Sequence, residues 1–507
     1  MNLLILESPG KVKKVQSYLG NDWKVVASVG HVRDLPEREL GIALPDFTPA
    51  YVPTERGKEV LNRLKGLAAS ASAVYLATDP DREGEAIAWH IADALHLKAP
   101  KRVTYGEITA SAIQTAVKAP RSLDMALVSA QEARRVLDRF CGYLVSGPLS
   151  RAANERLSAG RVQSPAVRLV VERERAIQNF VPVTHYGAEL AFADGWCATW
   201  ITKPWLENGQ EYLLNKALAE QAAAVRSLVV LECKETESHT APPAPFTTSS
   251  LQQAASNTLK FTPKQTMQLA QKIYEGGHCT YMRTDSPNLS AEAVTEIRAF
   301  CESQGWPLVD KPRSWKSKEG AQEAHEAIRP THAEVEEAGD TPDEQALYRL
   351  IRLRTLASQL ADAVYDVRVL HLKAEVDAKE AVFEARGRVL RDLGWKLLTS
   401  TDAATQDEEA DGDAPENPVP MLTEGQNVIA SGGKLLTKKT KPPTRFSEAS
   451  LVRELENRGI GRPATFAAIV DTIMHRKYVR VEKRQLVPTP LGEKVVDLLT
   501  GSFTFLD

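Results

Sequence analysis

The chain has 507 residues, too many for a single core, and at about 150 residues per domain it suggests roughly three or four domains. Its 43% hydrophobic and 25% charged residues are ordinary for a globular protein. The 63 Lys and Arg residues against 66 Asp and Glu residues give a net charge of -3, which excludes a uniformly basic protein that coats nucleic acid. Any nucleic-acid surface must therefore be local.

The spacing of the cysteines and the first residues of the chain indicate in which cellular compartment the protein is expected. The two nearest of the five cysteines, Cys279 and Cys301, are 22 positions apart, so neither a disulfide framework nor a CxxC zinc pair is present in the sequence. The opening MNLLILES reaches Glu7 after four apolar residues, too few for a signal peptide, and no apolar run reaches 18 residues. We expect a cytoplasmic protein that does not span a membrane.

Three short apolar segments near the N-terminus alternate with helical patterns. Residues 2–8, 24–32 and 73–78 each fit a buried strand closed by polar residues or glycine. This alternation predicts a parallel α/β domain. From about residue 124 to 177 the pattern becomes helical and rich in arginine, so one face of that region could contact phosphates.

The second half of the chain combines β-rich and helical regions. Residues 178–240 and 368–400 have patterns typical of strands, and the stretch between them is mostly helical. We therefore predict a helical domain inserted into a β-rich domain. Residues 401–420 hold seven acids and no base, as expected for a solvated linker. Residues 445–507 begin with a serine-capped helical pattern.

One helix inside the insert has clear start and stop signals. Thr262 can cap its N-terminus, and Pro263 suits its first turn. The pair Gly276 and Gly277 predicts its end. Tyr281 follows this double-glycine break, so we expect it on an exposed strand or loop.

The strongest local signal for chemistry is AVYLATDPDREGEAIAWH, residues 73–90. Here an apolar strand is followed by Asp79, Asp81 and Glu83, whose mutual repulsion a hard divalent cation would relieve. Glu7 ends the first strand, and ligands collect where parallel strands end, so Glu7 could face the same crevice. A polar turn before a capped helix explains these acids equally well, and both interpretations stay open.

Other motifs are weaker taken singly. ESPGKVKK, residues 7–14, and GGK, residues 432–434, both lack the Walker spacing, so no ATP site is predicted. Lys11 lies one helical turn from Glu7 and would suit a reacting phosphate, although a solvated lysine fits as well. LSAGRVQSP, residues 157–165, permits close backbone approach to phosphate or base, but it also fits an ordinary turn at a helix start.

Tyr281 on its own fits a half-buried aromatic residue. Arg283 changes this interpretation, because residues i and i+2 of an extended segment share a face. Its guanidinium would then lower the pKa of the phenol and offer a fork of donors to a phosphate. The two residues together favour a nucleophile beside a phosphate site.

Seven segments in chain order resemble type IA DNA topoisomerases, specifically the bacterial topoisomerase I branch. They are ESPGKVKK, GHVRDLP, ATDPDREGEAIAWH, QEARRVLDRFCGY, LSAGRVQS, YEGGHCTYMRTDS and RFSEASLVRELENRGIGRPATF. The resemblance runs through nearly the whole chain. It implies a multidomain α/β and α+β protein, with an N-terminal Toprim α/β domain and helical and β domains arranged as a toroid around a DNA-sized hole.

The resemblance implies four domains. We expect a Toprim domain at 1–123, a discontinuous helical DNA-gripping domain at 124–177 plus 402–507, a β-rich hinge domain at 178–240 plus 368–401, and an inserted helical domain with the tyrosine at 241–367. The family's closing module usually extends further than GSFTFLD, and many bacterial members add zinc ribbons. We therefore expect the DNA-gripping domain to be incomplete at its C-terminus.

The resemblance also assigns residue roles. Tyr281 becomes the nucleophile, and Arg283 supports the transition state. Lys11 becomes a phosphate contact, and His325 belongs to the surrounding network. The acids that handle Mg²⁺ are Glu7, Asp79, Asp81 and Glu83. The single-strand path is lined by His31, Arg134, Arg135, Asp138, Tyr143, Ser158, Ala159, Gly160, Arg161, Val162 and Gln163, and Arg462 and Thr465 contact the DNA backbone nearby. Ser150 stands where we expect an aromatic that stacks on a base.

The implied reaction is ATP-independent relaxation of negatively supercoiled DNA. Tyr281 attacks a phosphodiester in single-stranded DNA and forms a 5'-phosphotyrosyl bond, while an acid such as Glu7 protonates the leaving 3'-oxygen. The other strand passes through the gap, and the reverse attack reseals the break. We expect single-stranded and negatively supercoiled DNA as partners, Mg²⁺ as cofactor, and a monomer. Alternatives are a topoisomerase III-like decatenase, another Toprim enzyme such as a primase or nuclease, and a silent DNA-binding scaffold.

Overall fold

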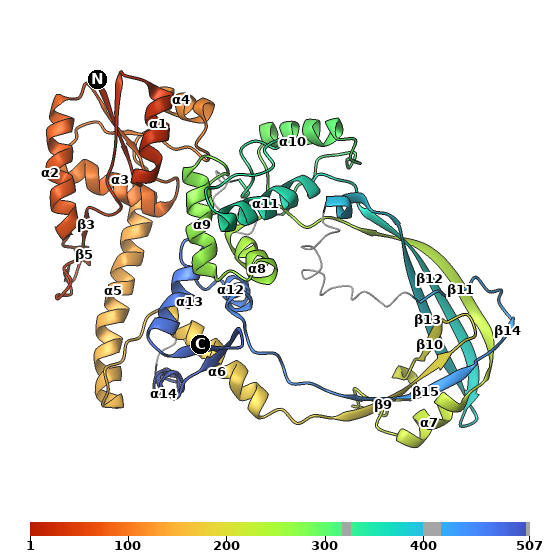
Figure 1. Cartoon of the computed structure of the whole chain (residues 1–507). Helices are drawn as coiled ribbons and strands as arrows, with labels where there is room; N and C mark the ends of the chain where they lie inside the picture. Colours follow the sequence, from red (N-terminus) through yellow and green to blue (C-terminus); the bar gives the residue numbers. More distant parts are fainter. Residues whose placement is uncertain (317–325, 399–416, 503–507) are drawn as a thin grey trace.

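The computed structural model describes residues 1–316, 326–398 and 417–502. Figure 1 shows the chain as a ring, with the N-terminal α/β domain at one side and long curved strands at the other. The expected toroid is thereby confirmed. None of the helices within the described ranges has the length and apolar character needed to cross a membrane.

The N-terminal domain is built on a four-stranded parallel sheet with the order β2-β1-β7-β8. Its strands are β1 (Asn2–Leu6), β2 (Trp23–Ala27), β7 (Val74–Ala77) and β8 (Lys101–Arg102). Helices α1 (Val12–Leu19) and α4 (Ala110–Lys118) cover one face, and α2 (Glu55–Ser70) and α3 (Arg82–Ala94) cover the other. The predicted parallel α/β domain is confirmed. Because β1 and β7 are parallel neighbours, their carboxyl ends lie side by side.

Small pieces complete this domain. The turn η1 (Pro9–Lys11) precedes α1, β3 (Arg33–Asp34) pairs with β6 (Val52–Pro53), and β4 (Ile42–Ala43) pairs with β5 (Thr48–Pro49). The long helix α5 (Met125–Ala153) then leads away from the sheet, as Figure 1 shows.

A helical module encloses a second core beside the lower end of α5. It consists of α6 (Gln163–Gln178), α12 (Glu448–Asn457), α13 (Phe466–His475) and α14 (Pro490–Leu499), with the hairpin β16 (Val479–Glu482) and β17 (Gln485–Pro488). Segments some 300 residues apart in the chain thus share one apolar core, and this makes the module discontinuous in sequence.

A seven-stranded sheet with the order β14-β11-β12-β13-β10-β9-β15 forms the far side of the ring. Its strands are β9 (Thr184–Ala191), β10 (Cys197–Trp200), β11 (Ser227–Thr240), β12 (Ala363–Val376), β13 (Lys379–Asp392), β14 (Asn427–Ile429) and β15 (Gly432–Lys439). Helix α7 (Lys216–Ala224) packs on it, and the short turns η2 (Lys203–Trp205) and η3 (Gly394–Leu398) flank it.

Two predicted domain limits are wrong. The helical module does not resume at residue 402, because β14 pairs with β11 and β15 pairs with β9 along its whole length. The insert also ends before residue 367, since β12 begins at Ala363. Short strands whose partners lie about 200 residues or more away in the chain leave no local sign of the sheet they join.

The insert contains α8 (Thr248–Thr258), α9 (Pro263–Glu275), α10 (Ala291–Ser303) and α11 (Pro342–Ala357). Helix α9 begins as predicted, with the Thr262 hydroxyl accepting a hydrogen bond from a backbone N–H and Pro263 in the first turn. It ends at Gly276, and Gly277 has a φ of 69°, a backbone conformation that glycine adopts without strain. The apolar core of the insert is continuous with that of the N-terminal domain.

Candidate active site

The ends of β1 and β7 place acidic side chains together. Glu7 directly follows β1, and its carboxylate accepts a hydrogen bond from the Asp79 backbone N–H at 3.4 Å. Asp81 caps α3 by accepting a hydrogen bond from the Gly84 N–H at 2.8 Å. Three carboxylates from two strand ends therefore face the insert.

The pKa of Glu7 is strongly perturbed. Burial, together with the negative charges of Asp79 and Asp81, raises the pKa of Glu7 to about 7, although Lys11 and Arg283 act in the opposite direction. A carboxyl group with this pKa is protonated in part of the population at neutral pH. It can therefore deliver a proton to a leaving oxygen.

Lys11 is a buried cation at the same edge. Its ammonium group donates a hydrogen bond to the Asp79 carboxylate and lies 4.7 Å from the centre of the Tyr274 ring. Burial alone would lower the pKa of Lys11, but Asp79, together with Tyr105 and Glu7, raises the pKa above its usual value. Lys11 thus stays positively charged beside the acids, as a phosphate contact requires.

Glu83 faces away from the other acids. Its carboxylate lies 3.7 Å from the His31 imidazole, and the hydrogen bond from His31 lowers the pKa of Glu83 to about 2. Burial disfavours the charged imidazole, yet Glu83 raises the pKa of His31. Within the described parts of the chain, no three of the predicted metal acids bring ligand oxygens within 4.8 Å of one another. In this arrangement, the positive charges that pair with these acids all belong to side chains.

Tyr281 comes from the insert and reaches the acids of the N-terminal domain. Its hydroxyl donates a hydrogen bond to Asp81 Oδ2 at 2.7 Å, and its backbone N–H donates to the Gly106 carbonyl at 2.8 Å. Its ring lies edge-on to Tyr274, with 5.4 Å between centroids. The side chain is 4% exposed, so the expectation of an exposed strand or loop is wrong: the segment is a loop buried against the other domain.

The expected depression of the tyrosine pKa is also wrong in this arrangement. Burial and the negative charges of Asp81 and Asp79 raise the pKa of Tyr281 well above its usual range, and Arg283 lowers it only in part. Arg283 does lie close, 3.6 Å from the Asp81 carboxylate. The phenol is therefore protonated while the two domains are in contact.

Two contacts that the sequence did not reveal hold the same interface. Arg329 of the insert donates a hydrogen bond to Glu107 of the N-terminal domain at 2.9 Å, and both side chains are largely buried. The ammonium group of Lys14 donates to the Gly276 carbonyl. Isolated charged residues far apart in the chain carry no signal of such pairing.

A groove of about 760 Å³ runs from the acids along α9. Its walls include Glu7, Asp79 and Arg283 at one end and Pro463 and Ala464, just before α13, at the other. The polar face of α9 also contributes Lys264, Gln265, Gln268 and Gln271. These α9 residues were not predicted, although their spacing opposite the apolar stripe of that helix gave a signal.

Arg462 and Thr465 flank this groove in sequence. The Arg462 N–H donates to the Thr465 hydroxyl at 2.9 Å, and the guanidinium of Arg462 bonds the Gly461 carbonyl at 2.7 Å. Through Pro463 and Ala464, the predicted DNA-contacting GRPAT segment lines the same groove as Glu7 and Asp79, more than 380 residues earlier in the chain.

The predicted DNA residues on α5 form ion pairs. Arg135 donates two hydrogen bonds to the Asp34 carboxylate, at 2.8 and 2.6 Å. Asp138 lies 3.7 Å from Arg134 and 3.1 Å from Arg161. The structure therefore gathers Arg134, Asp138 and Arg161 into one cluster and attaches α5 to the N-terminal domain through Arg135.

The SAGRVQ segment connects α5 to α6. Ser158 bonds the Tyr478 hydroxyl through its backbone N–H at 2.8 Å, and the Ala159 N–H donates to Ser146 at 3.0 Å. Gly160 donates to the hydroxyl of Ser164 at 3.1 Å. Val162 directly precedes α6 without a side-chain capping bond, and Gln163 is the first residue of the helix. These contacts fix the segment as a turn whose backbone is held by both neighbouring helices.

The structure describes two of the three remaining predicted positions, Tyr143 and Ser150. Tyr143 is 41% exposed, and its hydroxyl donates to the Glu37 carbonyl at 3.2 Å. Ser150 bonds the Leu157 backbone at 2.8 and 3.0 Å, so it anchors the turn after α5. His325 lies outside the described residues, and its role stays a prediction.

Comparison with known proteins identifies the family. Residues 122–507 match the DNA topoisomerase family, and residues 2–111 match the Toprim domain family. A plasmid DNA topoisomerase I of Xylella fastidiosa is 53% identical over 517 aligned residues, which cover 100% of this chain and 78% of the relative. DNA topoisomerase 1 of Pseudomonas aeruginosa is 41% identical over 100% of this chain and 62% of the relative.

A solved structure agrees. Full-length topoisomerase I of Thermotoga maritima superposes with a TM-score of 0.85 at 36% identity, covering 98% of this chain and 82% of that chain. Both family matches and both relatives indicate a DNA topoisomerase. The contact between Tyr281 and Asp81 is consistent with that family. The chain belongs to the bacterial DNA topoisomerase I family of type IA topoisomerases.

Proposed function

We propose that the chain relaxes negatively supercoiled DNA without ATP, by cutting and resealing one strand through a 5'-phosphotyrosyl bond on Tyr281. The observation that carries the proposal is the 2.7 Å hydrogen bond between the Tyr281 hydroxyl and Asp81, because it joins a nucleophile of the insert to the acids of the Toprim domain. The contacts across this interface are noncovalent, so they can separate and re-form. We expect a cytoplasmic monomer that acts on single-stranded regions.

The proton transfers can be assigned to residues that already contact one another. When a phosphodiester enters the groove, Asp81 takes the proton of the attacking Tyr281 hydroxyl, whose hydrogen bond it accepts. Glu7 gives its proton to the 3'-oxygen that leaves, which suits its pKa of about 7. The reverse transfers accompany resealing.

Two cations would stabilise the negative charge on the phosphoryl oxygens. Arg283 lies 3.6 Å from Asp81 and lines the groove, and Lys11 lies beside Asp79. Preorganised donors in a partly buried site act strongly on such charge. Because the phosphotyrosyl ester retains the energy of the broken bond, resealing needs no nucleotide.

Mg²⁺ fits part of the predicted acid set. Glu7, Asp79 and Asp81 offer carboxylate oxygens, which this ion prefers, and their mutual repulsion is visible in the raised pKa of Glu7. We propose that these three would hold Mg²⁺, which would supply positive charge for aligning the ends of the cut strand. Glu83 bonds His31 instead, so we assign it a positioning role.

The test is relaxation of supercoiled plasmid with and without Mg²⁺, paired with denaturation of the protein on a single-stranded oligonucleotide. We expect relaxation without ATP and a covalent protein–DNA adduct, both lost in Tyr281→Phe. Free cleaved ends without an adduct would instead indicate a nuclease, and unchanged properties of Tyr281→Phe would indicate a DNA-binding scaffold. Faster decatenation than relaxation would indicate the topoisomerase III-like role.

A further inference from the structure

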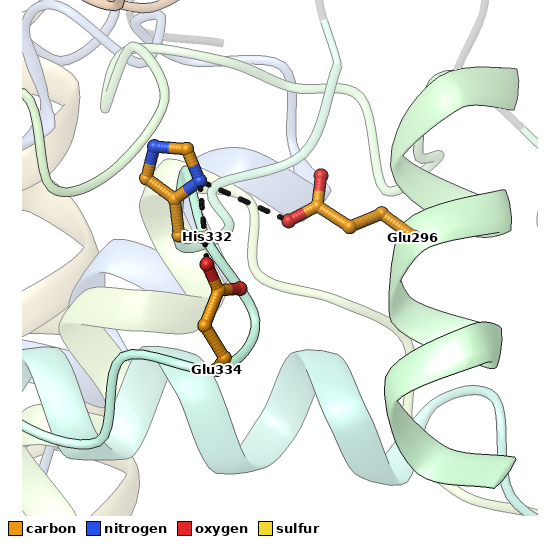
Figure 2. A group of neighbouring side chains, drawn as sticks. All are labelled: Glu296, His332 and Glu334. Carbon is orange, nitrogen blue, oxygen red and sulfur yellow. Dashed lines mark ion pairs between the residues drawn. The ribbon is translucent and has the colours of Figure 1, made fainter. Parts of the chain in front are cut away.

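A cluster of three exposed side chains lies in the insert, away from the acids of the Toprim domain. Figure 2 shows Glu296, on α10, opposite His332 and Glu334 of the loop before α11. His332 Nδ1 is 4.0 Å from Glu296 Oε1 and 3.8 Å from Glu334 Oε1. Their three candidate ligand atoms all lie within 4.8 Å of one another, and no other group among the described residues does so.

The charges of this cluster are unbalanced. Both carboxylates approach the same ring nitrogen, as the two dashed lines in Figure 2 show. One proton on Nδ1 can be donated to one carboxylate at a time. In the part of the chain that the structure covers, neither Glu296 nor Glu334 forms an ion pair with a lysine or arginine. A divalent cation would satisfy both carboxylates and the nitrogen together.

The backbone that carries two of the ligands is fixed. Ala333, between His332 and Glu334, is 2% exposed and packs in the same apolar cluster as α10. Its carbonyl accepts a hydrogen bond from Arg352 at 2.9 Å, and its N–H donates to Glu296 Oε1 at 3.4 Å. The buried alanine therefore holds its two neighbours facing Glu296.

The spacing suits a small contraction onto one ion. Ligand atoms about 2.0–2.1 Å from a tetrahedral Zn²⁺ are roughly 3.3 Å apart, so the present separations need to shorten by about 0.5–1.5 Å. Rotation of exposed side chains supplies movements of that size. One imidazole nitrogen with two carboxylate oxygens favours Zn²⁺ or a similar transition metal over Mg²⁺, which prefers oxygen ligands alone.

We propose that Glu296, His332 and Glu334 bind one divalent transition-metal ion of the Zn²⁺ class, with water completing its coordination. The bound ion would join α10 to the segment that supports the tyrosine. Next to His332, Thr331 donates its N–H to the His278 carbonyl at 3.0 Å and its hydroxyl to the Gly277 carbonyl at 2.9 Å. Binding of the ion would therefore rigidify the support of Tyr281 from outside the reaction site.

The test is Zn²⁺ binding to the chelator-treated full chain in millimolar Mg²⁺, which occupies sites made of oxygen ligands. We expect one Zn²⁺ per chain and a rise in melting temperature. His332→Ala and Glu296→Gln, each checked for folding by circular dichroism, should weaken Zn²⁺ binding at least about tenfold and abolish the rise. Co²⁺ in place of Zn²⁺ should give a visible absorption band that the same variants lack.

His371→Ala is the matched control. His371 also has two glutamates beside it, but Glu232 lies 3.6 Å from Nδ1 and Glu384 lies 3.1 Å from Nε2, on opposite sides of the ring. These carboxylates cannot share one ion with a single nitrogen, so this variant should bind Zn²⁺ as the unchanged chain does. The absence of stoichiometric binding would overturn the proposal. So would equal binding by the His332→Ala variant, or an equal loss in the His371→Ala control.

Discussion

Opening of the interface between the Toprim domain and the insert can be perturbed at one ion pair, with Glu107→Gln. Arg329 donates to Glu107 across the interface at 2.9 Å, and the two side chains are 9% and 20% exposed. The substitution keeps the shape of the side chain and removes its charge. It does not leave Arg329 unpaired, because Glu326 and the Pro330 carbonyl still accept from it.

The free-energy loss expected for Glu107→Gln depends on the hydrogen bonds that Arg329 retains. A hydrogen bond to a charged group contributes about 1.5–3 kcal/mol, and the retained partners of Arg329 place this loss near the lower end. A loss of ~1.5 kcal/mol corresponds to about a tenfold increase in the population of the open interface. Each domain should stay folded, since Arg329 keeps its partners Glu326 and the Pro330 carbonyl within the insert.

Hydrogen exchange measures this opening directly. The Tyr281 N–H is bonded to the Gly106 carbonyl of the other domain, so its exchange reports separation of the domains. We expect about tenfold faster exchange of that amide in Glu107→Gln. The control is Glu55→Gln, which removes an exposed pair with Lys58 inside the Toprim domain and should leave the Tyr281 amide unchanged. Equal exchange in Glu107→Gln and the original chain would refute the reasoning.

The remaining predictions concern charge in the groove. The pKa of Glu7 is raised from 4.5 to about 7 in the folded protein, so the folded state holds this proton more tightly than the unfolded state does. The resulting contribution to the free energy of unfolding, up to about 3 kcal/mol, is fully present below pH 4.5 and is lost as the pH rises through 7. Melting temperatures measured in chelator across that range should show this loss in the original chain and not in Glu7→Gln; parallel curves would contradict it. Asp79→Ala, which keeps the Asp81 carboxylate that accepts the Tyr281 hydrogen bond, should impair resealing more than cleavage in a single-turnover oligonucleotide assay, whereas equal loss of both steps would count against a metal that aligns the cut ends. Lys264→Ala should weaken single-strand binding and lower the salt dependence of affinity by about one ion; an unchanged slope in a salt titration would place Lys264 off the DNA path.

The features predicted correctly from the sequence are those with local causes. Helix α9 starts at Thr262 and Pro263 because a capping hydroxyl and a first-turn proline act within a few residues. The parallel sheet likewise follows from apolar strands that alternate with helices. Its topology placed Glu7 beside Asp79, since neighbouring parallel strands end at one edge.

The features missed depend on distant partners. The burial of Tyr281 is caused by a domain whose nearest acid, Asp81, is 200 positions away in the chain, and nothing in the local pattern distinguishes this loop from an exposed one. The same holds for β15, which is mostly exposed and pairs with β9 after a long connection. The pairing of Arg283 with Tyr281 was predicted, but its electrostatic result was not, because burial outweighs one nearby positive charge.

If Tyr281 is the nucleophile, as proposed, the arrangement of the site would couple its protection to the contact between the two domains. While the domains are in contact, burial and the negative charge of Asp81 keep the Tyr281 phenol protonated, and Asp79 neutralises Lys11. A phosphate that enters the groove brings negative charge to Arg283 and Lys11, which then interact with the phosphate instead of with the acids alone. In the proposed mechanism, attack by Tyr281 would therefore be favoured only when a strand is present. In the proposed mechanism these contacts would have to break for the ring to open, so we expect their net strength to stay within a few kcal/mol. The loss of ~1.5 kcal/mol expected for Glu107→Gln lies within that range.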